Sequence, residues 1–203
     1  MFAKRGGVCL TLSNKITLSR IFLIPFFMIA AFPLPNQESF PEWLRVTRII
    51  AALVFFVVAE LTDIWDGKLA RKRNEVTDLG KFLDPIADKL LVTAALLCFC
   101  AEWKFYVWPT MIILMREFAV SGLRQIAAAK GVVIAAGKLG KLKTTLQTTS
   151  LTTLLSAKVL GLMFGRHIDL FITAVGHVVM GLAVILTIVS GIEYFVKNSK
   201  VLK

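Results

Sequence analysis

Two apolar stretches of this chain reach the length of a membrane-spanning helix only if each takes in acidic residues. A spanning helix needs about 20 mostly apolar residues, yet the run 49–59 ends at Glu60 and the run 90–100 begins just after Asp88 and Lys89. The acids and the glycine at these edges are Asp63, Asp66, Gly67, Asp84 and Asp88. Ionisable groups at such positions indicate a functional site. The runs are therefore either buried soluble helices or spans that include their acids.

Composition decides between these two options. The chain is 57% hydrophobic, whereas a soluble domain is about 45–50% apolar. The candidate spans are 18–35, 46–69, 82–102, 105–129, 142–164 and 170–196. Little sequence is left for a soluble domain, and there is no long linker or internal repeat. We therefore predict an all-α integral membrane protein in which residues 1–203 form one domain with six transmembrane helices.

The positive charges predict the orientation of that domain. With the N-terminus inside, fifteen of the 24 Lys and Arg residues fall in cytoplasmic segments, and the opposite loops carry only Arg45, Arg48, Lys104 and Arg166. Positive residues favour the cytoplasmic side, so we expect both termini there. The net charge of +11 then marks a membrane face that meets anionic lipid or phosphate groups. Nucleic acid is excluded as a partner, because the basic residues are scattered and form no binding motif.

The acids follow helical spacing in both stretches. The first stripe is spaced i, i+3, i+4 and i+7, which puts two carboxylates and two small residues on one face: Asp63, Asp66, Gly67 and Ala70. In the second, Asp84 and Asp88 share a face at i and i+4, and Pro85 is tolerated if it lies in the first turn of its helix. The polar segment 72–79 is a short turn, so four carboxylates converge near the membrane surface.

Four neighbouring carboxylates repel one another unless cations compensate them. All-oxygen coordination suits Mg²⁺ or Mn²⁺, which keep bound water and also reach substrate phosphates. Such ions neutralise charge on a transferred group, so the cluster favours phosphoryl-transfer chemistry. The alternative is that the acids are merely solvated loop residues, a reading better suited to one pair than to four carboxylates spaced around Gly67.

The full pattern reads Asp63-x2-Asp66-Gly67-x2-Ala70-Arg71-x8-Gly80-x3-Asp84-x3-Asp88. It resembles, without a gap, the signature of the CDP-alcohol phosphatidyltransferase family, whose six-span fold also agrees with this chain. The resemblance implies two divalent ions and transfer of a phosphatidyl group from CDP-diacylglycerol to an alcohol, with release of CMP. It further implies a homodimer in the bacterial inner membrane, with its active site on the cytoplasmic face.

The resemblance also implies residue roles. The metal ligands would be Asp63, Asp66, Asp84 and Asp88, the last of which would also be the general base for the acceptor hydroxyl. The residues beside the nucleotide would be Asp63, Gly67, Ala70, Arg71 and Gly80. Of these, Gly67 and Ala70 would leave space for the cytidine and Arg71 would face the phosphates. A helix-entry turn explains Gly80 equally well.

The N-terminal residues Asn14, Thr17 and Arg20 lie on one predicted helical face. They resemble a stretch that lies beside the nucleotide in one branch of the family, so we expect them to contact CDP-diacylglycerol. As an alternative, Asn14 caps the first helix and Arg20 extends to the lipid head groups.

Cationic residues outside the signature bear on the acceptor. They are Arg116, Arg124, Lys141 and Lys143, and an anionic substrate needs such groups beside carboxylates. The strings around Arg116 and Lys141 also resemble the branch that uses glycerol 3-phosphate. Lys141 and Lys143 could equally be ordinary positive anchors. Because Glu117 does not share a helical face with Arg116, we expect another acid to pair with that arginine.

Three features leave other functions open. His177 is expected to pack or to form an interhelical hydrogen bond rather than to bind metal. Lys158 either extends to the membrane interface or pairs with another residue. The Thr-rich segment 144–153 could line a transport pathway or bond to its own backbone. A small membrane transporter is therefore one alternative, and a sibling transferase that uses inositol phosphate, serine or phosphatidylglycerol is another.

Overall fold

The computed structural model is helical throughout the residues that it describes, which are 12–35, 39–73, 78–132, 134 and 137–198; for 12–16, 63–73, 78–85 and 88 it describes the backbone alone. The elements in order are α1 Leu12–Ala31, α2 Glu42–Arg73, α3 Asp78–Glu102, the 3-10 helix η2 Lys104–Tyr106, α4 Val107–Ala129, α5 Lys138–Phe164 and α6 Arg166–Lys197. Each predicted span overlaps one of the six α-helices. The all-α prediction is therefore confirmed.

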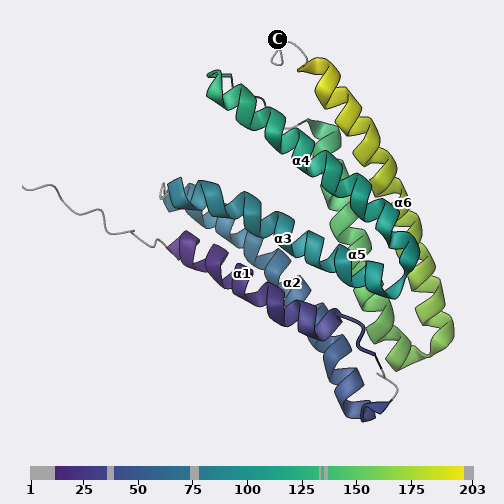
Figure 1. Cartoon of the computed structure of the whole chain (residues 1–203). Helices are drawn as coiled ribbons and strands as arrows, with labels where there is room; N and C mark the ends of the chain where they lie inside the picture. Colours follow the sequence, from purple (N-terminus) through teal and green to yellow (C-terminus); the bar gives the residue numbers. More distant parts are fainter. Residues whose placement is uncertain (1–11, 36–38, 74–77, 133, 135–136, 199–203) are drawn as a thin grey trace, which may run out of the picture.

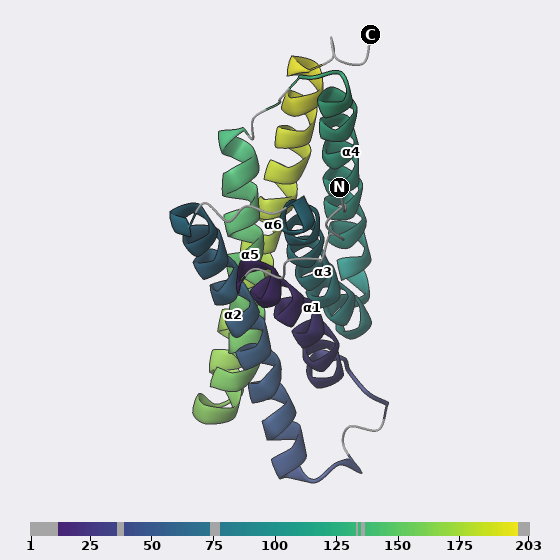
Figure 2. The ribbon, with the colours of Figure 1, turned by 90° about the vertical axis from the view of Figure 1, so that its left-hand side faces the viewer.

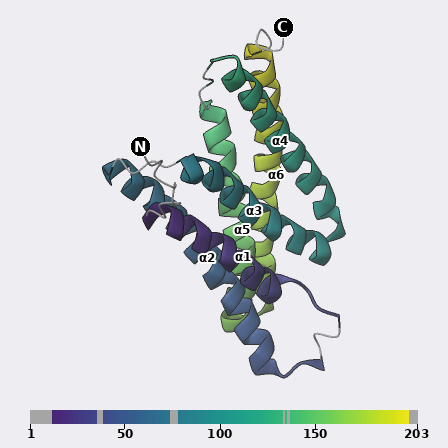
Figure 3. The same cartoon turned by 60° about the vertical axis from the view of Figure 1, so that its left-hand side comes forward.

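The helices form two groups that cross (Figure 1). Helix α1 packs against α2 and α3, α6 packs against α4 and α5, and α2 meets α5 between the groups. The end of α1, the start of α2, the end of α3 and the α5–α6 turn lie together at one end of the molecule (Figures 1 and 3). Toward the other end, α2 and α3 diverge from α4 and α6 (Figures 1 and 3). The turned view in Figure 2 shows the end of α2 well apart from α4.

The core lies where the two groups cross. Phe27 of α1 and Phe56 of α2 are buried with ring centroids 5.7 Å apart, and Leu96, Leu151 and Leu154 add aliphatic surface from α3 and α5. Transfer of one such side chain from water to a protein interior contributes about 1.5–3 kcal/mol. In a bilayer, close packing rather than water exclusion holds such residues together.

Large apolar side chains also cover the outer faces of the helices, as on α6, where Phe171 and Val178 are exposed. Within the described residues, one helix is by itself long and apolar enough to cross a bilayer, and that helix is α6. The described part of α1 adds a shorter apolar helix, Thr17–Ala31. Six membrane spans with both termini in the cytoplasm stay a prediction.

Glycines permit the close approach of α5 and α6. A Cβ at Gly176 would lie 2.6 Å from Leu154 Cδ2, and one at Gly161 would lie 2.6 Å from Asp169 Cβ. Ser150 Oγ donates a 2.7 Å hydrogen bond to the Gly176 carbonyl, which joins the two helices. Gly165 reverses the chain between them with a φ of +91°, a conformation that costs glycine little.

Candidate active site

The family signature spans two joined helix ends. Asp63, Asp66, Gly67, Ala70 and Arg71 lie in the last three turns of α2, and Gly80, Asp84 and Asp88 lie in the first three turns of α3. Their side chains fall outside the described residues, so the predicted ligand set is placed by its backbone alone. The predicted turn 72–79 includes residues 74–77, which lie outside the described residues.

Two details of the predicted helix starts are wrong. Helix α3 begins at Asp78, so Pro85 is its eighth residue and lies beyond the first turn. Gly80 lies in that first turn, as a helix-entry residue would. Helix α1 includes Leu12 and Ser13, so Asn14 lies within the helix rather than at its cap; the Asn14 side chain is outside the described residues.

Thr17 and Arg20 face the interior of the helix bundle. Thr17 is 0% exposed and Arg20 is 1% exposed, so the alternative in which Arg20 extends to the lipid head groups is wrong. The two residues are one turn apart on the face of α1 that packs against α2 and α3. A buried guanidinium is costly unless polar groups surround it, so this face of α1 is expected to be polar where it meets the helices that carry the signature.

Arg116, Glu117 and Lys143 form a second polar cluster, between α4 and α5. Glu117 Oε1 accepts hydrogen bonds from Arg116 Nη1 at 3.1 Å and from Lys143 Nζ at 2.5 Å. The expectation that Arg116 pairs with another acid is therefore wrong. Adjacent helical residues point about 100° apart, but the long arginine side chain reaches back to its neighbour. Lys143 is only 2% exposed, so it is not a surface anchor.

The surroundings of Arg116 are shaped to hold it. Arg116 Nη2 lies 3.4 Å from Ser190 Oγ of α6. A Cβ at Gly140 would lie 3.2 Å from Arg116 Nη2, and one at Gly191 would lie 3.2 Å from its Cγ. Small residues on α5 and α6 thus leave room for the guanidinium inside the α4–α5–α6 junction.

Two buried polar atoms in this junction have no hydrogen-bond partner among the described residues. They are Arg116 Nε and Gln147 Oε1, and Gln147 lies one helical turn beyond Lys143. Buried donors and acceptors are nearly always satisfied, so an unmatched donor and an unmatched acceptor near one ion-pair cluster are suited to a polar ligand or to water. The sequence prediction missed Gln147, although its i, i+4 relation to Lys143 was a usable signal.

The other two predicted acceptor residues do not join this cluster. Arg124 Nε donates to Tyr194 Oη at 3.0 Å, and its guanidinium lies 5.5 Å from the centroid of that ring. Lys141 is exposed at the start of α5. Arg116 and Lys143 are thus brought together on one carboxylate, whereas Arg124 is bound to α6 and Lys141 faces outward.

Lys89 links the helix that carries Asp84 and Asp88 to the helix that carries Arg116. Its ammonium group donates a hydrogen bond to Ser121 Oγ of α4. The sequence prediction did not single out this contact, because nothing in the sequence pattern shows which faces of α3 and α4 meet.

The remaining polar residues have structural roles. His177 Nδ1 lies 3.0 Å from Tyr106 Oη, which confirms the predicted interhelical hydrogen bond. Lys158 of α5 pairs with Glu102 of α3. The Thr-rich segment bonds to its own backbone four residues back, as Thr144 and Thr152 show. These hydroxyls are therefore used within the helix, as expected for a packed span rather than a pathway.

The described part of the chain is helical, has buried cationic residues and carries a carboxylate-rich signature at the joined ends of two helices. These are features of a membrane enzyme that acts on phosphates. The sequence matches the CDP-alcohol phosphatidyltransferase family over residues 10–189. The chain belongs to this family.

Three relatives of this chain are named for the same enzyme activity. A Bacillus subtilis protein named CDP-diacylglycerol--glycerol-3-phosphate 3-phosphatidyltransferase is 43% identical over 195 residues, which cover 95% of this chain and 97% of the relative. A Rickettsia felis protein of the same name is 38% identical and covers 91% and 93%. A Mycobacterium tuberculosis protein named probable phosphatidylglycerophosphate synthase is 35% identical and covers 90% and 79%.

Proposed function

We propose that this chain transfers the phosphatidyl group of CDP-diacylglycerol to glycerol 3-phosphate, giving phosphatidylglycerol phosphate and CMP. The observation that carries the proposal is the gapless signature at the joined ends of α2 and α3. Two relatives that align with this chain over nearly their whole length are named for this activity. The buried cationic cluster on α4 and α5 supports a phosphorylated acceptor.

The donor set at the signature fits divalent metal ions. Four aspartates on two consecutive helix ends offer only oxygen ligands, which suit Mg²⁺ or Mn²⁺. The residues that would hold two such ions are Asp63, Asp66, Asp84 and Asp88. When bound, the ions supply positive charge that stabilises the phosphoryl oxygens during transfer.

The residues of the chain then divide the chemical work. Asp88 takes the proton from the acceptor hydroxyl as general base. The acceptor oxygen forms a bond to the phosphorus that carries diacylglycerol, while the bond from that phosphorus to the CMP oxygen breaks. The nucleotide part of the donor would be held by Asn14, Thr17, Arg20, Asp63, Gly67, Ala70, Arg71 and Gly80.

Arg116 and Lys143 would bind the phosphate of glycerol 3-phosphate. Both cations contact Glu117, which holds them in place and limits the repulsion between them. Guanidinium groups bind phosphate through paired, charge-assisted hydrogen bonds, and Arg116 Nε is a buried donor still available for one. Arg124 and Lys141 would add positive charge at the entrance to this site.

The proposal includes the setting of the enzyme. Residues 1–203 would form one domain with six spans, with both termini and the active site on the cytoplasmic face of the bacterial inner membrane. The exposed apolar faces of the helices and the distribution of Lys and Arg support this placement. Two copies would pair as a homodimer.

CMP release by the purified protein tests the acceptor. The protein in detergent receives CDP-diacylglycerol and Mg²⁺ or Mn²⁺, together with glycerol 3-phosphate, inositol phosphate, serine or no acceptor. Release only with glycerol 3-phosphate is expected. CMP release with another acceptor would support the family reaction but identify a different acceptor. No CMP release by folded protein with any acceptor would refute the transferase assignment.

A further inference from the structure

A cavity of about 690 Å³ lies at the end of the molecule where the helices converge, away from the signature. Its walls come from the end of α1, the start of α2, the end of α3, the end of α5 and the start of α6. The signature lies instead at the end of α2 and the start of α3, where these helices have diverged from α4 and α6 (Figure 1). A volume of this size falls in the range of ligand sites, roughly 300–1,000 Å³.

The lining of the cavity has an apolar part. It is formed by side chains from α1, α2, α3 and α5, which are Phe27, Ala52, Ala95, Cys98, Phe99 and Leu155, and all six are buried. Phe27 lies one turn before the end of α1, and Leu155 lies nine residues before the end of α5, or about 13 Å at 1.5 Å per residue. The cavity therefore extends well below the helix ends, along a surface suited to a hydrocarbon chain.

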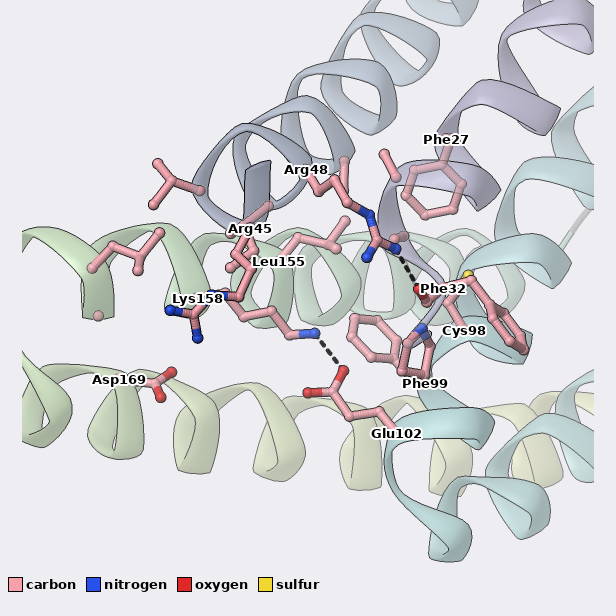
Figure 4. Close-up of a pocket in the computed structure, with 18 of the residues that line it drawn as sticks. Phe27, Phe32, Arg45, Arg48, Cys98, Phe99, Glu102, Leu155, Lys158 and Asp169 are labelled. Carbon is pink, nitrogen blue, oxygen red and sulfur yellow. Dashed lines mark hydrogen bonds and ion pairs between the residues drawn. The ribbon is translucent and has the colours of Figure 1, made fainter. Parts of the chain in front are cut away.

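The rest of the lining is charged and carries a net positive charge. Four cationic side chains line it, Arg45, Arg48, Lys158 and Arg166, against three acidic ones, Glu42, Glu102 and Asp169. Figure 4 shows Arg45, Arg48 and Lys158 extending into this space, with Glu102 and Asp169 opposite. The formal sum is +1, which one singly charged anion would balance.

Contacts within the protein satisfy only some of these charges. Lys158 pairs with Glu102. Arg48 Nη2 donates to the carbonyls of Ile29 at 3.1 Å and Phe32 at 2.7 Å, which caps the end of α1. Among the described residues, no carboxylate pairs with Arg48. In the part of the chain that the structure describes, Arg45 and Arg166 make no ion pair or hydrogen bond through their side chains. Two guanidinium groups at the cavity are thus free to bind an anion.

We propose that this cavity binds an anionic phospholipid with a single phosphodiester, whose phosphate contacts Arg45 and Arg166 and whose acyl chain lies along the Phe27–Phe99–Leu155 surface. The inference rests on the proposed function for one point, the membrane placement, which puts this end of the bundle at the outer interface where lipid is the abundant amphiphile. A free phosphate would use the cationic groups alone and leave the apolar part unused.

Lipid retention by the full-length protein tests the site. Native mass spectrometry is applied to protein in detergent with excess CDP-diacylglycerol, so that the catalytic site is filled, and phosphatidylglycerol is titrated in. The variants are R45Q and the R45Q/R166Q pair. The control is K104Q, which removes a positive charge from exposed η2 at the same end of the molecule but outside the cavity lining. Phosphatidylcholine and inorganic phosphate are the comparison ligands.

One phosphatidylglycerol should bind to wild type and to K104Q. Because the variant loses charge-assisted hydrogen bonds to the phosphate, R45Q/R166Q should bind it at least about tenfold more weakly, with R45Q between. CMP release should be the same in all four proteins. Equal affinity in R45Q/R166Q would overturn the proposal, and so would inorganic phosphate that displaces the lipid at equal concentration. Lipid retention without any CMP release would instead refute the proposed function and leave this site standing.

Discussion

Glu117 is the residue on which the cationic cluster of α4 and α5 depends. Its carboxylate contacts both Arg116 and Lys143, and the three side chains are largely buried. Because opposite charges out of water need one another, the same carboxylate that stabilises the fold also sets where the two cations lie. We therefore treat Glu117 as a positioning residue for the acceptor phosphate.

Replacing Glu117 with Gln should affect both stability and acceptor use. Two cations would lose their counter-charge, at a cost of about 1–3 kcal/mol, which thermal unfolding in detergent measures. The KM for glycerol 3-phosphate should rise about tenfold, equivalent to roughly 1.4 kcal/mol, while the KM for CDP-diacylglycerol stays constant. E193Q is the matched control, since Glu193 pairs with Lys197 on the exposed surface of α6, where a pair contributes about 0.3–0.5 kcal/mol. An unchanged acceptor KM in E117Q would contradict the positioning role.

Replacing Asp88 with Asn should remove the proposed general base. Such a group contributes about 10²–10⁴-fold to rate, so kcat should fall at least a hundredfold while the protein stays folded. The measurement is CMP release at saturating substrates, with E193Q again as the carboxyl-to-amide control. Turnover at the wild-type rate in D88N would remove Asp88 from the mechanism.

Sequence reasoning at the residue scale found the cationic residues but not their partners. Arg116 could be selected because a charge within a span is costly, and Lys143 because a phosphorylated acceptor needs cationic groups. Their shared carboxylate could not, since Glu117 and Lys143 are 26 positions apart and the segment between them includes a helix reversal whose geometry no local pattern contains. The contact of Lys158 with Glu102 was missed for the same reason.

At the level of whole helices, the packing of α5 against α6 depends on glycine. Gly176 touches Leu154 so closely that no side chain fits between the helices, whereas a Cβ at Gly181 on the same helix would meet nothing within 4 Å. The two positions differ in packing and share their helical conformation. They therefore separate the effect of helix–helix contact from that of helix propensity.

Replacing Gly176 with Ala should destabilise the protein, and the same change at Gly181 should not. Overpacking costs about 1–3 kcal/mol, while Ala is favoured over Gly inside a helix by up to about 1 kcal/mol. Thermal unfolding of the two variants in the same detergent measures the difference. A G176A protein as stable as G181A would show that α5 and α6 can separate without cost.

The number of helices and their approximate positions were the most predictable features of the fold. Apolar length gave all six α-helices, although the ends were displaced; α2 begins at Glu42 and α5 at Lys138, before the predicted 46 and 142. Polar residues extend these helices beyond the apolar run because backbone hydrogen bonding continues where hydropathy stops. The crossing of the two helix groups was not predictable, since no local sequence pattern shows which helix faces meet.

At the scale of the whole molecule, the proposed topology separates two chemical surfaces. The signature and the cationic cluster belong to the divergent end, and the proposed lipid cavity belongs to the convergent end. If both termini are cytoplasmic, the two sites face opposite sides of the membrane.

Single cysteines introduced into a cysteine-free background should report this orientation. A cysteine replacing Lys104 should react with a membrane-impermeant maleimide added to intact spheroplasts, because η2 would lie outside. A cysteine replacing Lys141, which is exposed at the start of α5, should react only after the membrane is opened. The reverse pattern would invert the topology, and labelling of both in intact cells would contradict a six-span fold.

The lipid product tests the account most directly. Protein in detergent is incubated with CDP-diacylglycerol, isotope-labelled glycerol 3-phosphate and Mg²⁺ or Mn²⁺, with a chelator-treated sample beside it, and lipids and CMP are quantified by mass spectrometry. The account predicts labelled phosphatidylglycerol phosphate in a one-to-one ratio with CMP, and neither product after chelation. CMP accompanied by unlabelled phosphatidic acid would mean hydrolysis rather than transfer, and would contradict a site built for glycerol 3-phosphate.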